Sequence, residues 1–225
     1  MSILYEARPS DSPYLDSVTW GRTLSDGRPI RPAEMRWHLV IARYRGKVHV
    51  TLTGPWSRSG VVTYDEGAEV LWIRFKLGTF MPHLPTRDFL NREIALPNGA
   101  GQSFWLNNSV WQFPTAENVE TFANRLARET VLMSDPVVAA ALQDHPLDLS
   151  PRTVRHHFLH TTGLTQAAIR QMVRAQQAAD QIRQGKPILD TVYDMGYFDQ
   201  PHLTRALRQY IGYTPSQIMP EKRAS

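Results

Sequence analysis

Two segments in the last third of the chain place polar and cationic side chains along one side of an expected helix. The first segment follows Ser150, and its apolar positions Val154 and Phe158 lie on the opposite side. Its polar side carries Arg152, Arg155, His156 and His160. The second segment spans residues 200–211, and its polar side carries Gln200, Arg205 and Arg208. Arginine can bond guanine O6 and N7, and glutamine can bond adenine N6 and N7, so both surfaces have the chemistry to read DNA bases.

A short apolar helix and a tight turn are expected before each polar segment. Residues 137–143 precede the first segment, where Ser150 is a favourable N-cap and Pro151 suits the first helical position. Residues 188–195 precede the second segment, which Asp199 caps. A scaffold helix followed by a presented helix is the helix-turn-helix arrangement, whose second helix enters a major groove. The pattern indicates two such units, although periodicity alone also permits a generic helical bundle with solvated charges.

A long helix over residues 166–184, capped by Thr165, is expected to join the two units. At 1.5 Å per residue it would be ~28 Å long, close to the ~34 Å between successive major-groove faces of one duplex. One chain could then read two adjacent grooves. The cations nearby that could contact phosphates are Arg170, Arg174 and Lys186. Residues 145–225 hold 10 Lys+Arg against 6 Asp+Glu, whereas residues 1–144 hold 15 of each, so the net charge of +4 comes from the part that would face DNA.

The first half of the chain is β-rich. Residues 37–42 and 47–52 are β-branched or aromatic runs joined by a turn, and residues 61–64 and 70–76 continue the pattern. We therefore expect an α+β protein with a small β-rich, barrel-like domain over residues 1–114. A helix over 116–132 is expected within a connecting segment, residues 115–133. Residues 134–225 complete the chain as an all-α domain with two helix-turn-helix units joined by the long helix.

Several kinds of chemistry find no support in the sequence. The absence of cysteine excludes a disulfide framework, a Cys-ligated zinc site and a thiol nucleophile. His156 and His160 have an i, i+4 spacing that can bind metal, but no third ligand is nearby, so no metal site is expected. No phosphate-binding loop, dinucleotide fingerprint or hydrolase motif occurs, and we expect neither an enzyme nor a cofactor. The longest apolar runs are far shorter than a membrane span and the start lacks a signal-peptide core, so a cytoplasmic protein is expected.

The C-terminal part resembles the DNA-binding domain of AraC-type (AraC/XylS) bacterial transcription regulators over residues 136–219. The resemblance rests on Leu149-Ser150-Pro151-Arg152, Phe158, Gly163-Leu164-Thr165, Ile188-Leu189-Asp190, Gly196-Tyr197-Phe198-Asp199-Gln200-Pro201-His202-Leu203-Thr204-Arg205 and Gly212-Tyr213-Thr214-Pro215. It implies sequence-specific transcription regulation with the second helix of each unit in a major groove. The residue types common in this family are not found at Leu159, Pro201 and Leu207. These differences bear on the strength and sequence of the DNA site and not on the fold.

The resemblance also implies which side chains touch DNA. The residues expected at base edges are Arg152, Arg155 and His156 in the first unit and Gln200, His202 and Arg205 in the second. Arg208 is expected nearer the phosphates. An alternative for Arg205 is an ion pair with a carboxylate such as Asp194, and Asp199 is expected to act as a helix cap first. Double-stranded DNA is thus the main expected partner. The resemblance also implies RNA polymerase as a second partner.

The first half resembles poorly characterised N-terminal domains that accompany this DNA-binding module, through Gly67 and residues 73–78. The resemblance implies that it senses a small-molecule effector or forms a homodimer. The alternative is a DNA-binding regulator without ligand sensing, controlled by a partner protein. His38, His49 and His83 are isolated, and structural roles are expected for them. The tryptophans Trp37, Trp72, Trp105 and Trp111 could line an effector pocket or simply form the core.

Overall fold

The N-terminal part of the chain forms a six-stranded antiparallel sheet in the computed structural model, which describes residues 3–220. In spatial order the strands are β1 (Ile3–Pro9), β2 (Leu15–Thr23), β7 (Glu69–Phe75), β4 (His38–Tyr44), β5 (Lys47–Thr53) and β9 (Glu93–Leu96). The predicted hairpin over 37–52 is confirmed as β4 and β5, which pair Leu39 with Leu52 and Ile41 with Val50. Successive side chains alternate between the two faces, so these four residues share the buried face.

This sheet is open. Strands β1 and β9 are its two edges, and they do not pair with each other within residues 3–220. Helix α1 (Val119–Arg128) and the hairpin of β10 (Ser103–Leu106) and β11 (Ser109–Gln112) pack on the apolar face of the sheet and cover its core. In a closed barrel, pairing of the two edge strands would enclose the core instead. The predicted β-rich region is therefore confirmed, but it is a covered open sheet and not a closed barrel.

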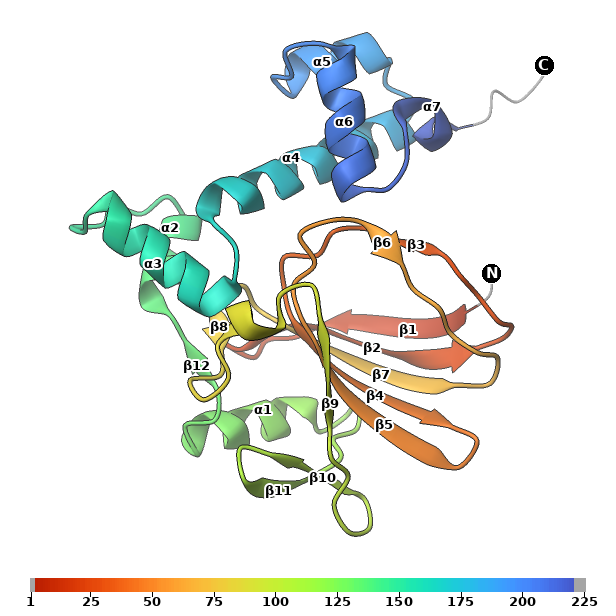
Figure 1. The fold of residues 1–225 in the computed structure, drawn as a ribbon, viewed down its shortest axis with the longest axis vertical. Coiled ribbons are helices and arrows are strands. Elements are labelled where there is room, and N and C mark those ends of the chain that lie inside the picture. The colour runs from red at the N-terminus through yellow and green to blue at the C-terminus, as the bar shows by residue number, and fades with distance from the viewer. Residues whose placement is uncertain (1–2, 221–225) are drawn as a thin grey trace.

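The remaining strands form two short ribbons. Strands β3 (Ile30–Arg31) and β6 (Gly60–Val61) pair in a ribbon near α6, and β8 (Thr79–Phe80) pairs with β12 (Met133–Ser134) near α3. A 3-10 helix, η1 (Thr86–Phe89), follows β8. Both ribbons and η1 lie on the side of the β-rich part that faces the C-terminal helices, whereas α1 and the β10–β11 hairpin lie at the other end of the molecule (Figure 1).

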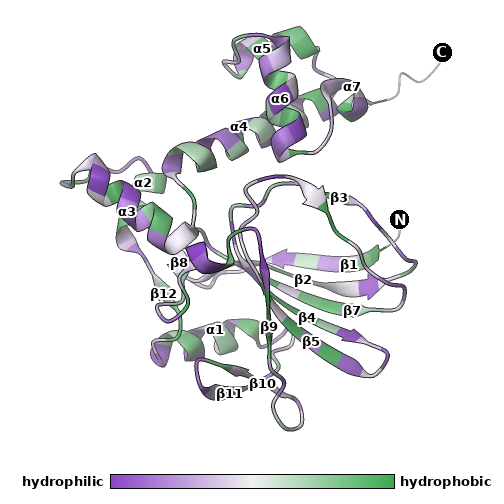
Figure 2. Cartoon of the chain, in the orientation of Figure 1, coloured by the Kyte–Doolittle hydropathy of each residue, from purple (hydrophilic) through white to green (hydrophobic). Residues whose placement is uncertain are grey.

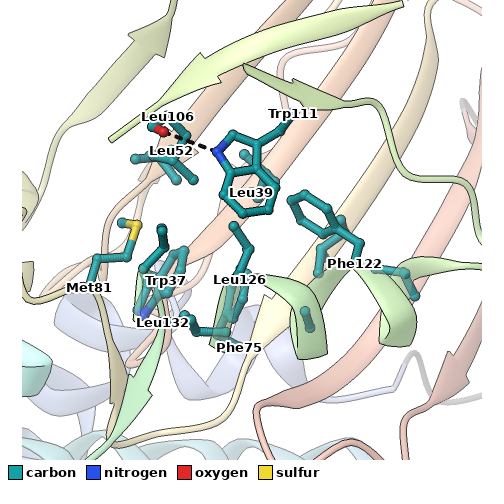
Figure 3. Close-up of a cluster of buried hydrophobic side chains, with 14 of the residues drawn as sticks. Trp37, Leu39, Leu52, Phe75, Met81, Leu106, Trp111, Phe122, Leu126 and Leu132 are labelled. Carbon is teal, nitrogen blue, oxygen red and sulfur yellow. Dashed lines mark hydrogen bonds between the residues drawn. The ribbon is translucent and has the colours of Figure 1, made fainter. Parts of the chain in front are cut away.

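The core of the β-rich part is aromatic and aliphatic (Figure 3). The Trp37 ring stacks on Phe75 with 3.7 Å between centroids, and its indole N–H donates to the Thr79 carbonyl at 2.7 Å. The Trp111 indole N–H donates to the Leu106 carbonyl at 3.0 Å. The indoles of Trp37 and Trp111 thus both keep a hydrogen-bond partner, which offsets the cost of burying a polar N–H.

The four tryptophans proposed for a pocket do not come together. Trp37 and Trp111 belong to the core, and the Trp105 side chain is 44% exposed. Trp72 lies between the core positions Leu71 and Ile73 on β7, so its side chain is on the opposite face of the sheet. The interpretation of Trp37 and Trp111 as core residues is confirmed. Helix α1 is also shorter than the predicted 116–132, because it begins after Asn118 and ends at Arg128.

The C-terminal part is helical and follows the predicted order. Its helices are α2 (Pro136–Leu142), α3 (Pro151–Thr162), α4 (Gln166–Arg183), α5 (Ile188–Asp194), α6 (Gln200–Tyr210) and α7 (Pro215–Ile218). Their bounds agree with the sequence predictions to within one residue at most ends, while the short α7 was not predicted. Two helix-turn-helix units, α2–α3 and α5–α6, lie at the two ends of α4 (Figure 1).

Each unit has its own small core, and α4 contributes to both. Ile169 and Met172 of α4 pack with Phe158 and Val138 in the first unit. Ala178, Ala179 and Ile182 of α4 pack in the second unit. Hydrophilic residues alternate with apolar ones along α3 and α6 (Figure 2), as expected for helices that bury one face and expose the other. No helix within residues 3–220 is long and apolar enough to cross a membrane.

Candidate nucleic-acid interface

Helix α3 presents the first cationic surface. The Ser150 hydroxyl accepts the Thr153 N–H at 3.2 Å, which caps the helix start, and Gly163 ends the helix with φ of 69°. Phe158 is fully buried, and this fixes which side of the helix faces outward. Three of the predicted site residues are exposed and make no side-chain hydrogen bond or ion pair with residues 3–220: Arg152, Arg155 and His156. These side chains are therefore free to meet a ligand.

The histidines of α3 have two different environments. The His156 and His160 rings stack with 6.2 Å between centroids, on the outer side of the helix. His157, which sequence reasoning did not single out, bonds the Asp135 carboxylate at 2.7 Å through Nδ1. The other Asp135 oxygen accepts the Val137 and Val138 N–H groups and caps α2. Within residues 3–220 no three His, Asp or Glu side chains are close enough together to hold a metal ion.

The Asp135 contact links the scaffold helix to the presented helix. Asp135 is 6% exposed, and its own N–H donates to the Gly78 carbonyl at 2.9 Å next to β8. One residue therefore joins the β-rich part, α2 and α3. An aspartate directly before a proline at a helix start was the only signal for it in the sequence, and that signal indicates the cap but not the histidine partner.

Helix α6 presents the second cationic surface. Asp199 caps it, because one carboxylate oxygen accepts the His202 N–H at 2.7 Å. Leu203 and Leu207 are buried on the inner side. Three predicted residues of this helix are exposed: Gln200, Arg205 and Arg208. Their side chains make no hydrogen bond or ion pair with residues 3–220. The alternative ion pair between Arg205 and Asp194 is not formed within residues 3–220, where Asp194 pairs with Lys186.

His202 is less available than the other predicted residues. Its ring packs edge-on against Tyr197 with 5.2 Å between centroids. Its Nδ1 accepts the Phe198 N–H at 3.4 Å, a long bond within the turn before α6. The His202 side chain therefore helps to hold the turn, and its contact with a base stays a prediction.

The cations expected on or near α4 are mostly occupied within the chain. The Arg174 guanidinium lies over the Tyr197 ring at 4.3 Å from its centroid and donates to the Gly196 carbonyl at 3.4 Å. Lys186 pairs with Asp194, and Arg170 lies 3.6 Å from Asp144 in an exposed pair. Arg174 thus stabilises the second helix-turn-helix unit, which makes it a poorer candidate for a phosphate contact than Arg208.

Helix α4 sets the spacing between the two surfaces. It has 18 residues, which corresponds to about 27 Å at 1.5 Å per residue. The Thr165 hydroxyl caps it by accepting the Ala168 N–H at 3.1 Å. The arrangement consists of two capped helices, whose exposed arginines have no ion pair in the described part of the chain, held at the two ends of one continuous helix. Such an arrangement suits an extended polyanion with a repeat of about 34 Å.

Comparison with known proteins agrees with this geometry. Residues 146–220 match the helix-turn-helix domain family, and this range covers both presented helices, α4 and α5. No curated protein shows significant sequence similarity to the chain.

Solved structures of ToxT from Vibrio cholerae are similar to the chain only at a low level. One crystal form of ToxT has 10% sequence identity to this chain and a TM-score of 0.34, and the alignment covers 96% of this chain and 97% of ToxT. ToxT from Vibrio cholerae O395 is 9% identical with a TM-score of 0.37, and the alignment covers 98% and 99% of the two chains. At these values the likeness carries no inference about function.

Proposed function

We propose that the protein is a transcription regulator of the AraC type that binds a specific DNA sequence, because residues 146–220 match the helix-turn-helix domain family. Helices α3 and α6 would each enter a major groove of the same duplex. The observation that carries this proposal is the pair of capped helices at the two ends of α4, whose exposed arginines are unpaired among residues 3–220. The division of the chain into a β-rich domain (1–114), a connecting segment (115–133) and a DNA-binding domain (134–225) belongs to this proposal.

The two helices would read different bases. Arg152, Arg155 and His156 face outward on α3, whereas Gln200 and Arg205 face outward on α6. Arginine favours guanine and glutamine favours adenine, so two different surfaces predict an asymmetric site. One chain would then suffice for one site, spanning about two adjacent major grooves.

The β-rich part is proposed to sense a small-molecule effector. A cavity of about 540 Å³ lies at one end of the sheet and has apolar lining from Trp20 and Leu71 and charged lining from Arg22, Arg43 and Glu69. This volume is within the range of roughly 300–1,000 Å³ that small-molecule sites occupy. The second candidate, a regulator controlled by a partner protein without an effector, predicts that no small molecule changes DNA affinity. Dimerisation and contact with RNA polymerase stay predictions of the family resemblance.

Selection of bound sequences from a random duplex pool tests the proposed function. The selected site should be asymmetric, and Arg205→Ala should weaken binding to it by about 1–3 kcal/mol and relax the preference at one or two base positions. An equal loss on random duplex would make Arg205 a phosphate contact. No enrichment of any sequence would contradict the proposal. Adding metabolites to the same binding assay distinguishes effector sensing from control by a partner protein.

A further inference from the structure

The C-terminal end of α6 is completed by loops of the β-rich part. The last four carbonyls of an α-helix lack partners within the helix. In α6 the Arg208 carbonyl accepts the Ser59 hydroxyl at 3.0 Å, and the Gln209 carbonyl accepts the Ser59 N–H at 2.8 Å. The Tyr210 carbonyl accepts the Ala33 N–H at 2.7 Å. The presented helix of the second unit therefore ends directly against residues far away in the sequence.

The approach at this end is close. A Cβ atom added at Gly212, just past α6, would lie 2.3 Å from a methyl carbon of Ile30 and 3.2 Å from Cβ of Ser59. Gly212 also has φ of 89°, which favours glycine. The loop that carries Ser59 is thus fixed beside α6 by both hydrogen bonds and packing.

The C-terminal end of α3 meets the β-rich part in a similar way. A Cβ atom added at Gly163, which ends α3, would lie 3.3 Å from Cα of Arg87 in η1. The His160 ring packs edge-on against Phe80 of β8 with 5.4 Å between centroids. The two presented helices therefore each end at a different loop of the β-rich part.

These two loops are connected to each other. The Asn91 N–H, two residues after η1, donates to the Pro55 carbonyl at 2.8 Å. The Asn91 side-chain oxygen accepts the Ser57 N–H at 2.8 Å and the Ser57 hydroxyl at 3.1 Å. The loops around η1 and Ser59 thus form one unit that contacts both presented helices.

Each loop exposes an arginine beside the helix end that it contacts. Arg58 precedes Ser59, is exposed, and makes no hydrogen bond or ion pair with residues 3–220. The Arg87 side chain is 62% exposed, and its one ion pair with the described residues 3–220, at 3.6 Å, is with its exposed neighbour Asp88. A helix in the major groove is flanked by phosphate strands, and cations at its borders contact phosphates.

We propose that Arg58 and Arg87 are phosphate contacts that the β-rich part adds to the DNA interface, one beside each presented helix. This inference rests on the proposed function and extends the interface beyond residues 134–225. The sequence did not suggest it, because residues 1–144 carry equal numbers of acidic and basic residues. The fold brings the loops that carry these two arginines against the C-terminal ends of α6 and α3. The neighbouring strands β6 and β8 lie on the side of the β-rich part that faces the C-terminal helices (Figure 1). The alternative to a DNA contact is a structural role, in which each arginine only stabilises the negative C-terminal end of the presented helix beside it.

The test is the salt dependence of DNA binding by the double variant Arg58→Gln/Arg87→Gln of the full chain. Each phosphate contact contributes about 0.9 to the slope of log K against log salt. The double variant should therefore make the negative slope shallower by about 1.8. With the affinity at 1 M salt unchanged, this slope lowers the affinity at 0.1 M salt by roughly 60-fold, about eightfold for each contact. The loss should be equal on the selected site and on random duplex, because phosphates carry no sequence information.

The matched control is Arg45→Gln/Arg128→Gln, which removes the same charge. Arg45 is in the β4–β5 turn and Arg128 ends α1, and Figure 1 places both elements away from α3 and α6. An unchanged slope in the Arg58/Arg87 variant, or an equal loss in the control, would overturn the inference. A lowered melting temperature with an unchanged slope would also overturn it and assign the arginines to the helix ends. If the wild-type chain fails to bind any duplex, the proposed function itself fails.

Discussion

Replacement of Asp135 by alanine should destabilise the junction between the β-rich part and the first helix-turn-helix unit. The substitution removes the cap of α2, worth about 1 kcal/mol. It also removes a hydrogen bond from His157 to a buried carboxylate, and hydrogen bonds to charged groups are worth about 1.5–3 kcal/mol. We expect the free energy of unfolding to fall by about 2–4 kcal/mol in urea titrations, since Asp135 is only 6% exposed.

Two further variants separate the parts of this effect. Asp135→Asn keeps an oxygen that can cap α2 and should recover about half of the loss. Asp148→Ala removes an exposed carboxylate that makes no side-chain hydrogen bond or ion pair with residues 3–220, and should change the free energy of unfolding by less than about 0.5 kcal/mol. The reasoning is refuted if Asp135→Ala is no more destabilising than Asp148→Ala, or if Asp135→Asn is as destabilising as Asp135→Ala.

Three other substitutions have outcomes that the structure defines. Burial, with a smaller effect of Arg74, lowers the pKa of His38 to about 4, so the unfolded chain binds this proton first and stability is lost as the pH falls from about 6.5 to about 4. His38→Gln should make urea unfolding less dependent on pH in this range. The hydrogen bond from Arg8 lowers the pKa of Glu120 to about 2, so its contribution is present above pH 4.5 and is lost as the pH falls through 2. Glu120→Gln should cost about 1 kcal/mol at pH 7, a value reduced for solvent screening, and the difference from wild type should shrink below pH 4.5. Asp199→Ala should cost about 1 kcal/mol in thermal unfolding and weaken DNA binding, whereas Asp199→Asn, which keeps a capping oxygen, should stay close to wild type in both.

The helical part of the fold could be predicted because its signals are local. Ser150, Thr165 and Asp199 cap the helices that they were predicted to cap, each by accepting an N–H three residues later. Gly163 and Gly196 have positive φ at the predicted ends and turns. Capping, glycine ends and apolar periodicity depend on neighbours in sequence, so one sequence is enough to read them.

The contacts that the sequence did not reveal join residues far apart along the chain. Ser59 meets Arg208 across 149 positions, and no local pattern marks a serine that completes a distant helix. Asp135 and His157 are 22 positions apart. His157 is partly buried, between the apolar and the exposed sides of α3, so apolar periodicity alone does not reveal its partner. Arg174 was predicted to face phosphate, but the Tyr197 ring beneath it comes from the next helix-turn-helix unit. Such pairings are set by tertiary packing, which composition and spacing do not encode.

Base-substitution interference on the selected DNA site, compared between Arg155→Ala and Arg205→Ala, decides whether one chain reads two grooves. We expect each variant to lose sensitivity at a different set of base pairs, with the two sets about one helical turn (~10 base pairs) apart and one chain bound per site. Loss at the same base pairs in both variants, or a symmetric site that requires two chains, would contradict the proposal that α3 and α6 of one chain enter adjacent major grooves.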